Sequence, residues 1–152
     1  METRIQVIVS LTHDELLPLL SASLSEGYDF VQKLWDEYQS GANRYDQDGA
    51  VLLGGYSEHG LCAIGGLHRD PYLNQPAIGR VRHVYVLPTA RRMGIGRQLV
   101  TALIDHSRAH FRILTLRTPT AHGDAFYRAL GFSTQPVYAE ATHWLALDTD
   151  HA

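Results

Sequence analysis

A glycine-containing turn between a strand and a helix is the feature that most constrains how this chain can fold. Residues 78–87 are rich in Val and Tyr, which predicts a strand, and Pro88 ends it. Gly94 and Gly96 then open a helix whose apolar residues, within 99–104, fall on one face. The first turn of a helix leaves backbone N–H groups unpaired at the positive end of its dipole. Because glycine also removes side chains that would keep a bulky anion away, this turn predicts a phosphate-binding site.

The charges are distributed unevenly along the chain. Residues 71–123 carry eight arginines and one acid, whereas residues 1–70 carry eleven acids against four bases. The net charge of −3 therefore hides a basic middle segment in an acidic protein. Since the rest of the surface would repel a polyanion, this pattern favours one bound anion and argues against nucleic acid as a partner.

Length and composition limit the remaining options. With 152 residues, 45% of them hydrophobic, the sequence predicts a single folded domain over 1–152. Cys62 is the only cysteine and the nine histidines form no ligand pattern, so we expect no disulfide and no metal. No apolar run is long enough for a bilayer and the first residues lack a signal-peptide layout, so we expect a cytoplasmic protein without a membrane partner. Monomer and homodimer both stay open.

Hydrophobic periodicity and turn residues predict alternating strands and helices. Thr12 and Glu15 form a capping-box pattern for the first helix, in which Leu17, Leu20 and Leu24 supply the apolar stripe. The predicted strands are 4–9, 50–56, 61–67, 78–87 and 113–117, with one or two closing strands at 137–138 and 142–147, and helices start at Thr12, Asp29, Gly96 and Thr120. This order predicts an α/β (α+β) fold, a mixed sheet with about four helices on its faces.

Three known kinds of phosphate cradle can be compared with the turn. A P-loop needs Gly-x-x-x-x-Gly-Lys-Ser/Thr, which is absent. A Rossmann fingerprint needs a third small residue where Leu99 stands. The string Arg91-x-x-Gly94-x-Gly96, after a strand that ends in Val-Leu-Pro, instead resembles the acetyl-CoA motif of the Gcn5-related N-acetyltransferase (GNAT) family.

A second stretch carries the same resemblance. Residues 125–132, Ala-Phe-Tyr-Arg-Ala-Leu-Gly-Phe, are similar to the later signature of that family, Phe-Tyr-x-x-Leu-Gly-Phe. One helix and one strand fit between the two motifs, as the family requires. The resemblance covers nearly the whole chain in element order, and its specific motifs lie in residues 80–132. It implies a mostly antiparallel sheet whose central strands splay apart.

The resemblance also implies acetyl-CoA as cosubstrate and assigns residues to it. The backbone of the strand before the turn would bind the pantetheine arm, and the turn and helix start would hold the pyrophosphate. The cofactor-binding residues implied in this way are Val84, Tyr85, Val86, Arg91, Arg92, Met93, Gly94, Ile95, Gly96 and Arg97. Tyr127 matches the tyrosine that protonates the departing CoA thiolate, a role that suits an O–H donor.

Arg80 and Arg82 stand where many relatives carry a Glu or His general base. Arginine does not release its proton in proteins and cannot be that base. The two arginines would either bind a carboxylate or phosphate of the acceptor, or pair with acids of the N-terminal helices. Other candidates for the base are Asp70, His83, Glu58 and His122, and a β-bulge would be needed to bring His83 to the face of Arg82.

Together these features predict an acetyl-CoA-dependent N-acetyltransferase. The amine of a small, anionic acceptor would attack the thioester directly in a ternary complex, with Tyr127 as the acid and with Arg80 and Arg82 binding the acceptor. The alternative is a non-catalytic acyl-CoA sensor or interaction module of the same fold, because no base is evident in the sequence.

Overall fold

The computed structural model describes residues 2–147, which form one six-stranded sheet with helices on both faces. In chain order the elements are β1 (Arg4–Val7), α1 (His13–Ser25), α2 (Phe30–Ser40), β2 (Val51–Ser57), β3 (Gly60–Arg69), β4 (Ile78–Val86), a 3-10 turn (Pro88–Ala90), α3 (Ile95–Ser107), β5 (Ile113–Leu116), α4 (Ala121–Ala129) and β6 (His143–Ala146). The strands lie side by side in sequence order. All neighbours are antiparallel except β4 and β5. The predicted mixed α/β sheet with four helices is confirmed.

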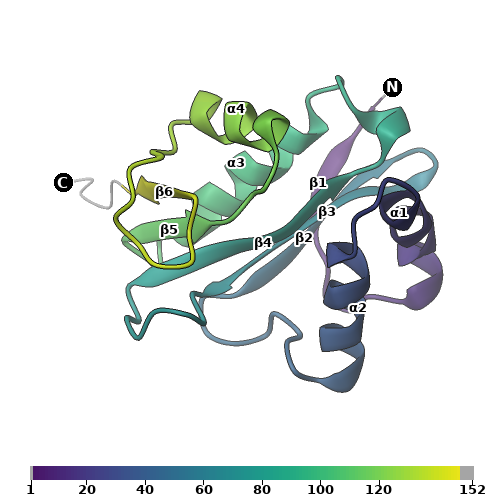
Figure 1. Ribbon diagram of the computed structural model, residues 1–152. Helices are drawn as coiled ribbons and strands as arrows, with labels where there is room; N and C mark the ends of the chain where they lie inside the picture. The colour runs from purple at the N-terminus through teal and green to yellow at the C-terminus, as the bar shows by residue number, and fades with distance from the viewer. Residues whose placement is uncertain (1, 148–152) are drawn as a thin grey trace.

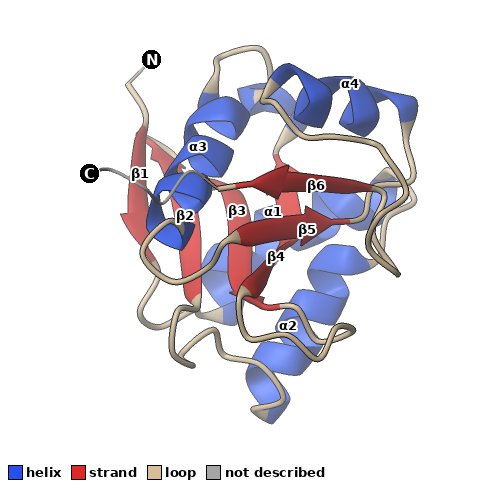
Figure 2. Ribbon diagram, turned by 90° about the vertical axis from the view of Figure 1, so that its left-hand side faces the viewer, coloured by secondary structure: helices blue, strands red, loops and turns tan. Residues whose placement is uncertain are grey.

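The sheet separates two hydrophobic cores. Figures 1 and 2 show α1 and α2 on one face and α3 on the other, with α4 beside α3. The α3 side is packed with Leu99, Val100 and Leu103, which are fully buried, as their spacing predicts. On the opposite face, α1 and α2 enclose a second cluster that includes Leu34 and Ile64. No helix within residues 2–147 is long and apolar enough to cross a bilayer.

The first helix begins as predicted but buries a different face. The Thr12 side chain accepts a hydrogen bond from the Glu15 N–H at 3.2 Å, and the Glu15 side chain accepts one from the Thr12 N–H. The predicted stripe is confirmed at Leu20, which is buried, and is wrong at Leu17 and Leu24, which are 44% and 50% exposed. The buried residues are Leu16, Leu19, Leu20 and Ser23. The hydrophobic pattern did not reveal this buried face because Ser23 is polar. Its hydroxyl donates to the Leu20 carbonyl, which allows a polar residue in the core.

The C-terminal part closes with one strand, where the sequence left one or two open. Among the described residues after β5 only β6 joins the sheet, pairing with β5, and Ser133 adds an isolated bridge to Trp144. The predicted strand at 137–138 is wrong: Val137 is 56% exposed and lies outside the sheet. Val137 and Tyr138 favour strand structure by residue type, but without a partner strand they form no ladder of hydrogen bonds.

The parallel strands β4 and β5 separate after a short contact. β4 pairs with β3 from Gly79 to Val86, whereas it pairs with β5 only at Ile78, Gly79 and Arg80. Beyond Arg80 the β5-facing edge of β4 has no strand partner among the described residues. This is the splay that the family resemblance implies, and it leaves backbone groups of β4 available to a ligand.

Candidate functional site

The turn between β4 and α3 presents a run of unpaired backbone donors. From Arg92 to Arg97, none of the N–H groups has a hydrogen-bond acceptor within residues 2–147, and the helical pairing resumes with the Gln98 N–H to the Gly94 carbonyl. Arg92 and Gly94 both have left-handed backbone, with φ of 69° and 79°. Successive N–H groups in such turns form a concavity for anions, and the α3 dipole adds to it. The geometry therefore suits a diphosphate, as the sequence predicts.

The two positions of the turn require glycine for different structural reasons. Gly94 is the N-cap of α3 and needs its positive φ, which a side chain would strain. At Gly96 an added Cβ would lie 3.3 Å from Cγ2 of Val86, tighter than an ordinary contact. Gly96 thus lets the first turn of α3 pack closely against the end of β4, which places the free N–H groups beside the splayed edge.

The three arginines of the turn are in different environments. Arg92 and Arg97 are exposed and have no ion-pair partner in the described part of the chain. Arg91 instead donates from both terminal nitrogens to Glu26, at 2.9 and 2.6 Å, and from Nε to the Val86 carbonyl. Sequence reasoning missed Glu26, because it lies 65 positions before Arg91 and no local pattern connects the two residues.

A cavity of about 410 Å³ lies where β4 and β5 diverge. Its walls are residues 80–84 of β4, residues 116–119 at the end of β5 and just after it, Phe30 and Lys33 of α2, and Tyr127 of α4. The cavity thus lies between helix α2 and the splayed strand β4. Of the four candidate bases, only His83 lines it.

Tyr127 has the environment of a hydrogen-bond donor. Its side chain is 8% exposed and packs against Phe132 and His143, with ring centroids 5.5 and 6.0 Å away. Within residues 2–147 its hydroxyl forms no hydrogen bond, and Tyr127 lines the cavity. Burial raises the pKa of Tyr127 well above its usual value, so the phenol keeps its proton at neutral pH.

The charge of Arg80 is paired inside the protein. It is 4% exposed, and its Nη1 lies 3.3 Å from Oδ2 of Asp70, which is also buried and which accepts a hydrogen bond from Thr115. The second terminal nitrogen donates to the Glu140 carbonyl at 2.7 Å. Asp70 belongs to the β3–β4 connection, so the acid that pairs with Arg80 does not come from the N-terminal helices. This pairing uses the Asp70 carboxylate and removes it as a free base.

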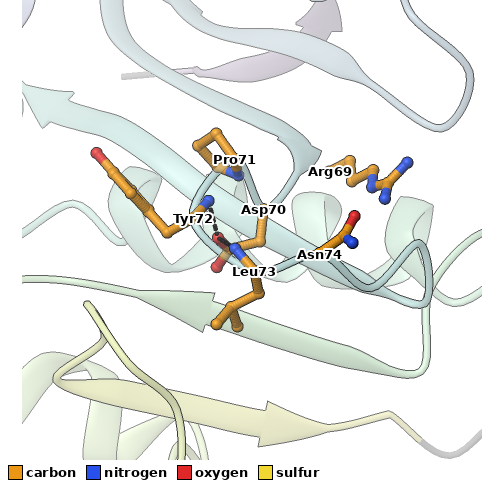
Figure 3. Close-up of a pocket in the computed structure, with 6 residues that line it drawn as sticks. All are labelled: Arg69, Asp70, Pro71, Tyr72, Leu73 and Asn74. Atoms are coloured by element: carbon orange, nitrogen blue, oxygen red, sulfur yellow. Dashed lines mark hydrogen bonds between the residues drawn. The ribbon is translucent and has the colours of Figure 1, made fainter.

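A smaller hollow under the β3–β4 connection belongs to this ion pair. Figure 3 shows Asp70 turned inward beneath the loop, with its carboxylate accepting the Tyr72 and Leu73 N–H groups at 2.7 and 3.2 Å. The Tyr72 ring lies 4.6 Å from the Arg80 guanidinium. Asp70, Arg80 and Thr115 thus form a buried group at the point where β4 and β5 part.

Arg82 has a different environment from Arg80. No carboxylate lies within ion-pair distance of its guanidinium in the described residues, and its Nη1 is 3.2 Å from Nε2 of His68. On the other side of that ring, the Asn43 amide nitrogen approaches Nδ1 at 3.3 Å, while the Asn43 oxygen accepts the Tyr45 N–H. A neutral imidazole can accept only one of these two donors. Arg82 is therefore a cation in the cavity wall without a negative partner.

A β-bulge brings His83 into the cavity. The β3–β4 register shifts between Ile64 and Gly66, and His83 has a φ of 57°. The extra residue interrupts the regular alternation between Arg82 and Tyr85, and both Arg82 and His83 line the cavity. The His83 Nε2 is buried without a hydrogen-bond partner, 3.8 Å from Oε1 of Glu37. Burial, reinforced by Arg82, lowers the pKa of His83 to about 3, so the ring is neutral at pH 7.

The neutral histidines predict a pH dependence of stability. Burial and then Arg82 lower the pKa of His68 to about 4, and His83 behaves alike. In the unfolded chain both titrate near 6.5, so below that pH the unfolded state binds more protons and stability falls toward pH 4. We expect a loss on the order of 2 kcal/mol per histidine, measured by urea unfolding at pH 7 and pH 4. Replacing both by Gln should flatten the slope, whereas a His59→Gln control should not; an unchanged slope in the double variant contradicts the prediction.

Three other expectations can be placed in the structure. Glu58 lies on the exposed β2–β3 turn beside His59, and His122 is exposed at the start of α4; neither lines the cavity. Thr120 caps α4 by accepting the Gly123 N–H at 2.9 Å. Within residues 2–147, no group of three His, Cys, Asp or Glu side chains is arranged to hold a metal ion.

Comparisons with known proteins agree with this geometry. A family model for the acetyltransferase (GNAT) domain matches residues 47–134. The crystal structure of a protein from Exiguobacterium sp. 255-15, assigned as an acetyltransferase, is 31% identical with a TM-score of 0.84, covering 96% of this chain and 94% of that one. A comparison with curated proteins gives no match.

Two more distant structures share the fold. One is a GNAT family N-acetyltransferase from Escherichia coli in complex with CoA, 16% identical with a TM-score of 0.72, over 96% of this chain and 82% of that one. The other is glucosamine-6-phosphate N-acetyltransferase from Arabidopsis thaliana, 16% identical with a TM-score of 0.62, over 92% and 97% of the two chains.

Proposed function

Because the chain belongs to the GNAT acetyltransferase family, we propose that it transfers the acetyl group of acetyl-CoA to the amine of a small anionic acceptor. The observation that carries the proposal is the run of free N–H groups at Arg92–Arg97, next to the unpaired edge of β4 and the cavity that ends at Tyr127. A diphosphate at the turn would direct an extended arm along β4 toward that cavity.

The residues of the turn and of β4 would hold acetyl-CoA, which supplies the thioester. The N–H groups from Arg92 to Arg97 would bind the pyrophosphate, with the Arg92 and Arg97 side chains adding charge. Backbone groups of Val84, Tyr85 and Val86 on the open edge would bind the pantetheine arm. The same edge offers N–H donors to the carbonyl oxygen, where negative charge develops as the amine attacks.

The transfer would proceed by direct attack in a ternary complex. The amine nitrogen bonds to the thioester carbon, the C–S bond breaks, and the sulfur leaves with the electron pair. Tyr127 would donate its proton to that sulfur and regain one from solvent. The amine loses its own proton to solvent in the cavity. Of the four candidate bases only His83 lines the cavity, and its pKa of about 3 makes the ring a weak proton acceptor.

Arg82 supports an anionic acceptor. Its guanidinium has no negative partner, whereas Arg80 is already neutralised by Asp70, so the acceptor contact that the sequence predicts for both arginines is proposed for Arg82 alone. A carboxylate or phosphate on the acceptor would form the ion pair that the protein itself does not provide.

The test begins with CoA binding. At about 100 Kd of CoA we expect the melting temperature to rise by roughly 5–10 °C. Pantetheine, which lacks the pyrophosphate, should give a smaller shift. Thiol release from acetyl-CoA is then measured with pairs of small amines that differ only in a carboxylate, such as amino acids and their decarboxylated amines.

The variants sharpen this assay. Arg82→Met should abolish the preference for the carboxylate-bearing amine, whereas Arg112→Met, away from the cavity, should keep it. No thermal shift with CoA contradicts the proposal. A shift without thiol release from any amine would favour the sensor alternative, and equal rates within the pairs would contradict an anionic acceptor.

A further inference from the structure

One carboxylate ties the acceptor-side helices to the cofactor turn. Glu26 follows α1 as its C-cap, and its two oxygens accept three side-chain donors. Arg91 contributes Nη1 to Oε2 at 2.9 Å and Nη2 to Oε1 at 2.6 Å, and the Tyr85 hydroxyl donates to Oε1 at 2.5 Å. The Arg91 guanidinium also lies 5.6 Å from the centre of the Tyr85 ring. These contacts join α1, β4 and the turn at one point.

Glu26 stands where its charge would otherwise be unfavourable. A helix C-terminus is the negative end of the dipole, so a carboxylate there needs compensation from a cation or from N–H and O–H donors. Arg91, and then Tyr85, lower the pKa of Glu26 by hydrogen bonding to its charged form. The contacts with Arg91 and Tyr85, and not the helix α1 itself, therefore stabilise the Glu26 carboxylate at this position.

Arg91 is the last anchor before the free N–H groups. The Ala90 and Arg91 N–H groups bond back to Leu87 and Pro88 within the turn, at 2.9 and 3.4 Å, and the next backbone donor with an acceptor is Gln98. Between them, the side-chain contacts of Arg91 with Glu26 and with the Val86 carbonyl attach the turn to the body of the protein.

We propose that Glu26 is a positioning residue for cofactor binding: through Arg91 and Tyr85 it holds the turn in the shape that directs the N–H groups of Arg92–Arg97 to a pyrophosphate. The inference deepens the proposed function and rests on it. Glu26 itself touches no ligand in this scheme. The Arg91 side chain, predicted from the motif as a cofactor contact, would act on the turn instead of on the phosphate.

The direct test measures CoA binding by calorimetry in the wild type and in Glu26→Gln. Loss of the charge leaves Arg91 without its partner, and we expect the Kd for CoA to rise about fivefold. The KM for acetyl-CoA should rise alike while kcat stays unchanged. Asp29→Asn is the matched control, because Asp29 lies in the same α1–α2 connection and its only ion-pair partner within residues 2–147 is Lys33, at 3.5 Å. The Kd of this variant for CoA should equal that of the wild type.

A double-mutant cycle identifies the route of the effect. If Glu26 acts through Arg91, then Glu26→Gln should add little in an Arg91→Met background. An additive effect would overturn the proposal. So would an unchanged Kd in Glu26→Gln, or a tighter one, which would mean that Glu26 withholds Arg91 from the phosphate.

Hydrogen exchange without ligand separates this inference from the proposed function. The Ala90 amide, bonded to the Leu87 carbonyl, should exchange faster in Glu26→Gln than in the wild type or in Asp29→Asn. Unchanged Ala90 exchange overturns the positioning role, whatever CoA does. Failure of the wild type to bind CoA would instead contradict the proposed function.

Discussion

Replacing Tyr127 by Phe will lower kcat for acetyl transfer about a hundredfold, the lower end of what a positioned acid contributes. The Kd for CoA should stay within about twofold, because the ring and its packing against Phe132 remain. Since the Tyr127 hydroxyl forms no hydrogen bond within residues 2–147 and lines the cavity, its removal should not lower the melting temperature either. A loss confined to kcat is the expected result.

The measurement is thiol release at saturating acetyl-CoA with the best amine of the panel, alongside CoA binding and thermal unfolding. Tyr138→Phe is the matched control, because Tyr138 packs against Trp144 away from the cavity. Undiminished kcat in Tyr127→Phe would assign the proton donor to another group or to water. A raised Kd for CoA with unchanged kcat would make Tyr127 a binding residue instead of an acid.

The second large effect concerns stability. Asp70→Asn leaves the Arg80 guanidinium buried without a counter-charge, and breaking a buried pair in this way costs about 3–5 kcal/mol. We expect the free energy of unfolding, from urea titration, to fall by that amount. The pair joining Arg117 to Glu140 offers the matched control: its side chains are 64% and 52% exposed, so Glu140→Gln should change stability by less than about 1 kcal/mol.

A double replacement tests the cause of that loss. Asp70→Asn combined with Arg80→Met removes both charges, and the Asn oxygen can still accept from the Tyr72 and Leu73 N–H groups. The double variant should therefore recover most of the stability, since no charge is then left unpaired. It also gives a soluble comparison if the single variant does not fold. A loss in Asp70→Asn no larger than in Glu140→Gln would mean that the ion pair does not stabilise the fold.

The sequence alone predicted the turn, the element order and the helix caps, because these depend on residues close together in the chain. Gly94 and Gly96 reveal an anion cradle through local backbone geometry, and Thr120 reveals a cap through its hydroxyl. The face of α1 was mispredicted because Leu16 and Leu17 both start an apolar series at helical spacing. In the structure the series that starts at Leu16 is the buried one, and its member Ser23 is polar, so the hydrophobic pattern did not favour it.

The partners of the charged residues could not be predicted in the same way. Arg80 was expected to meet an acceptor or the N-terminal acids, yet the antiparallel pairing of β3 and β4 brings Asp70 beside it. Glu26 meets Arg91 only once α1 has packed on the sheet. The rotation of His83 into the cavity depends on a bulge, which no residue pattern in 78–87 specifies.

The two hydrophobic cores support different parts of the candidate site. The cofactor turn continues into α3 and is supported by the core on that face, whereas Phe30 and Lys33 of the cavity belong to the helices above the other core. Under the proposed function, substitutions in α1 and α2 would change which amine is accepted while the packing beneath the cofactor turn stays intact. A scaffold of this kind can acquire new specificities one layer at a time, and Glu26 is a position in α1–α2 where such a change would also reach the cofactor.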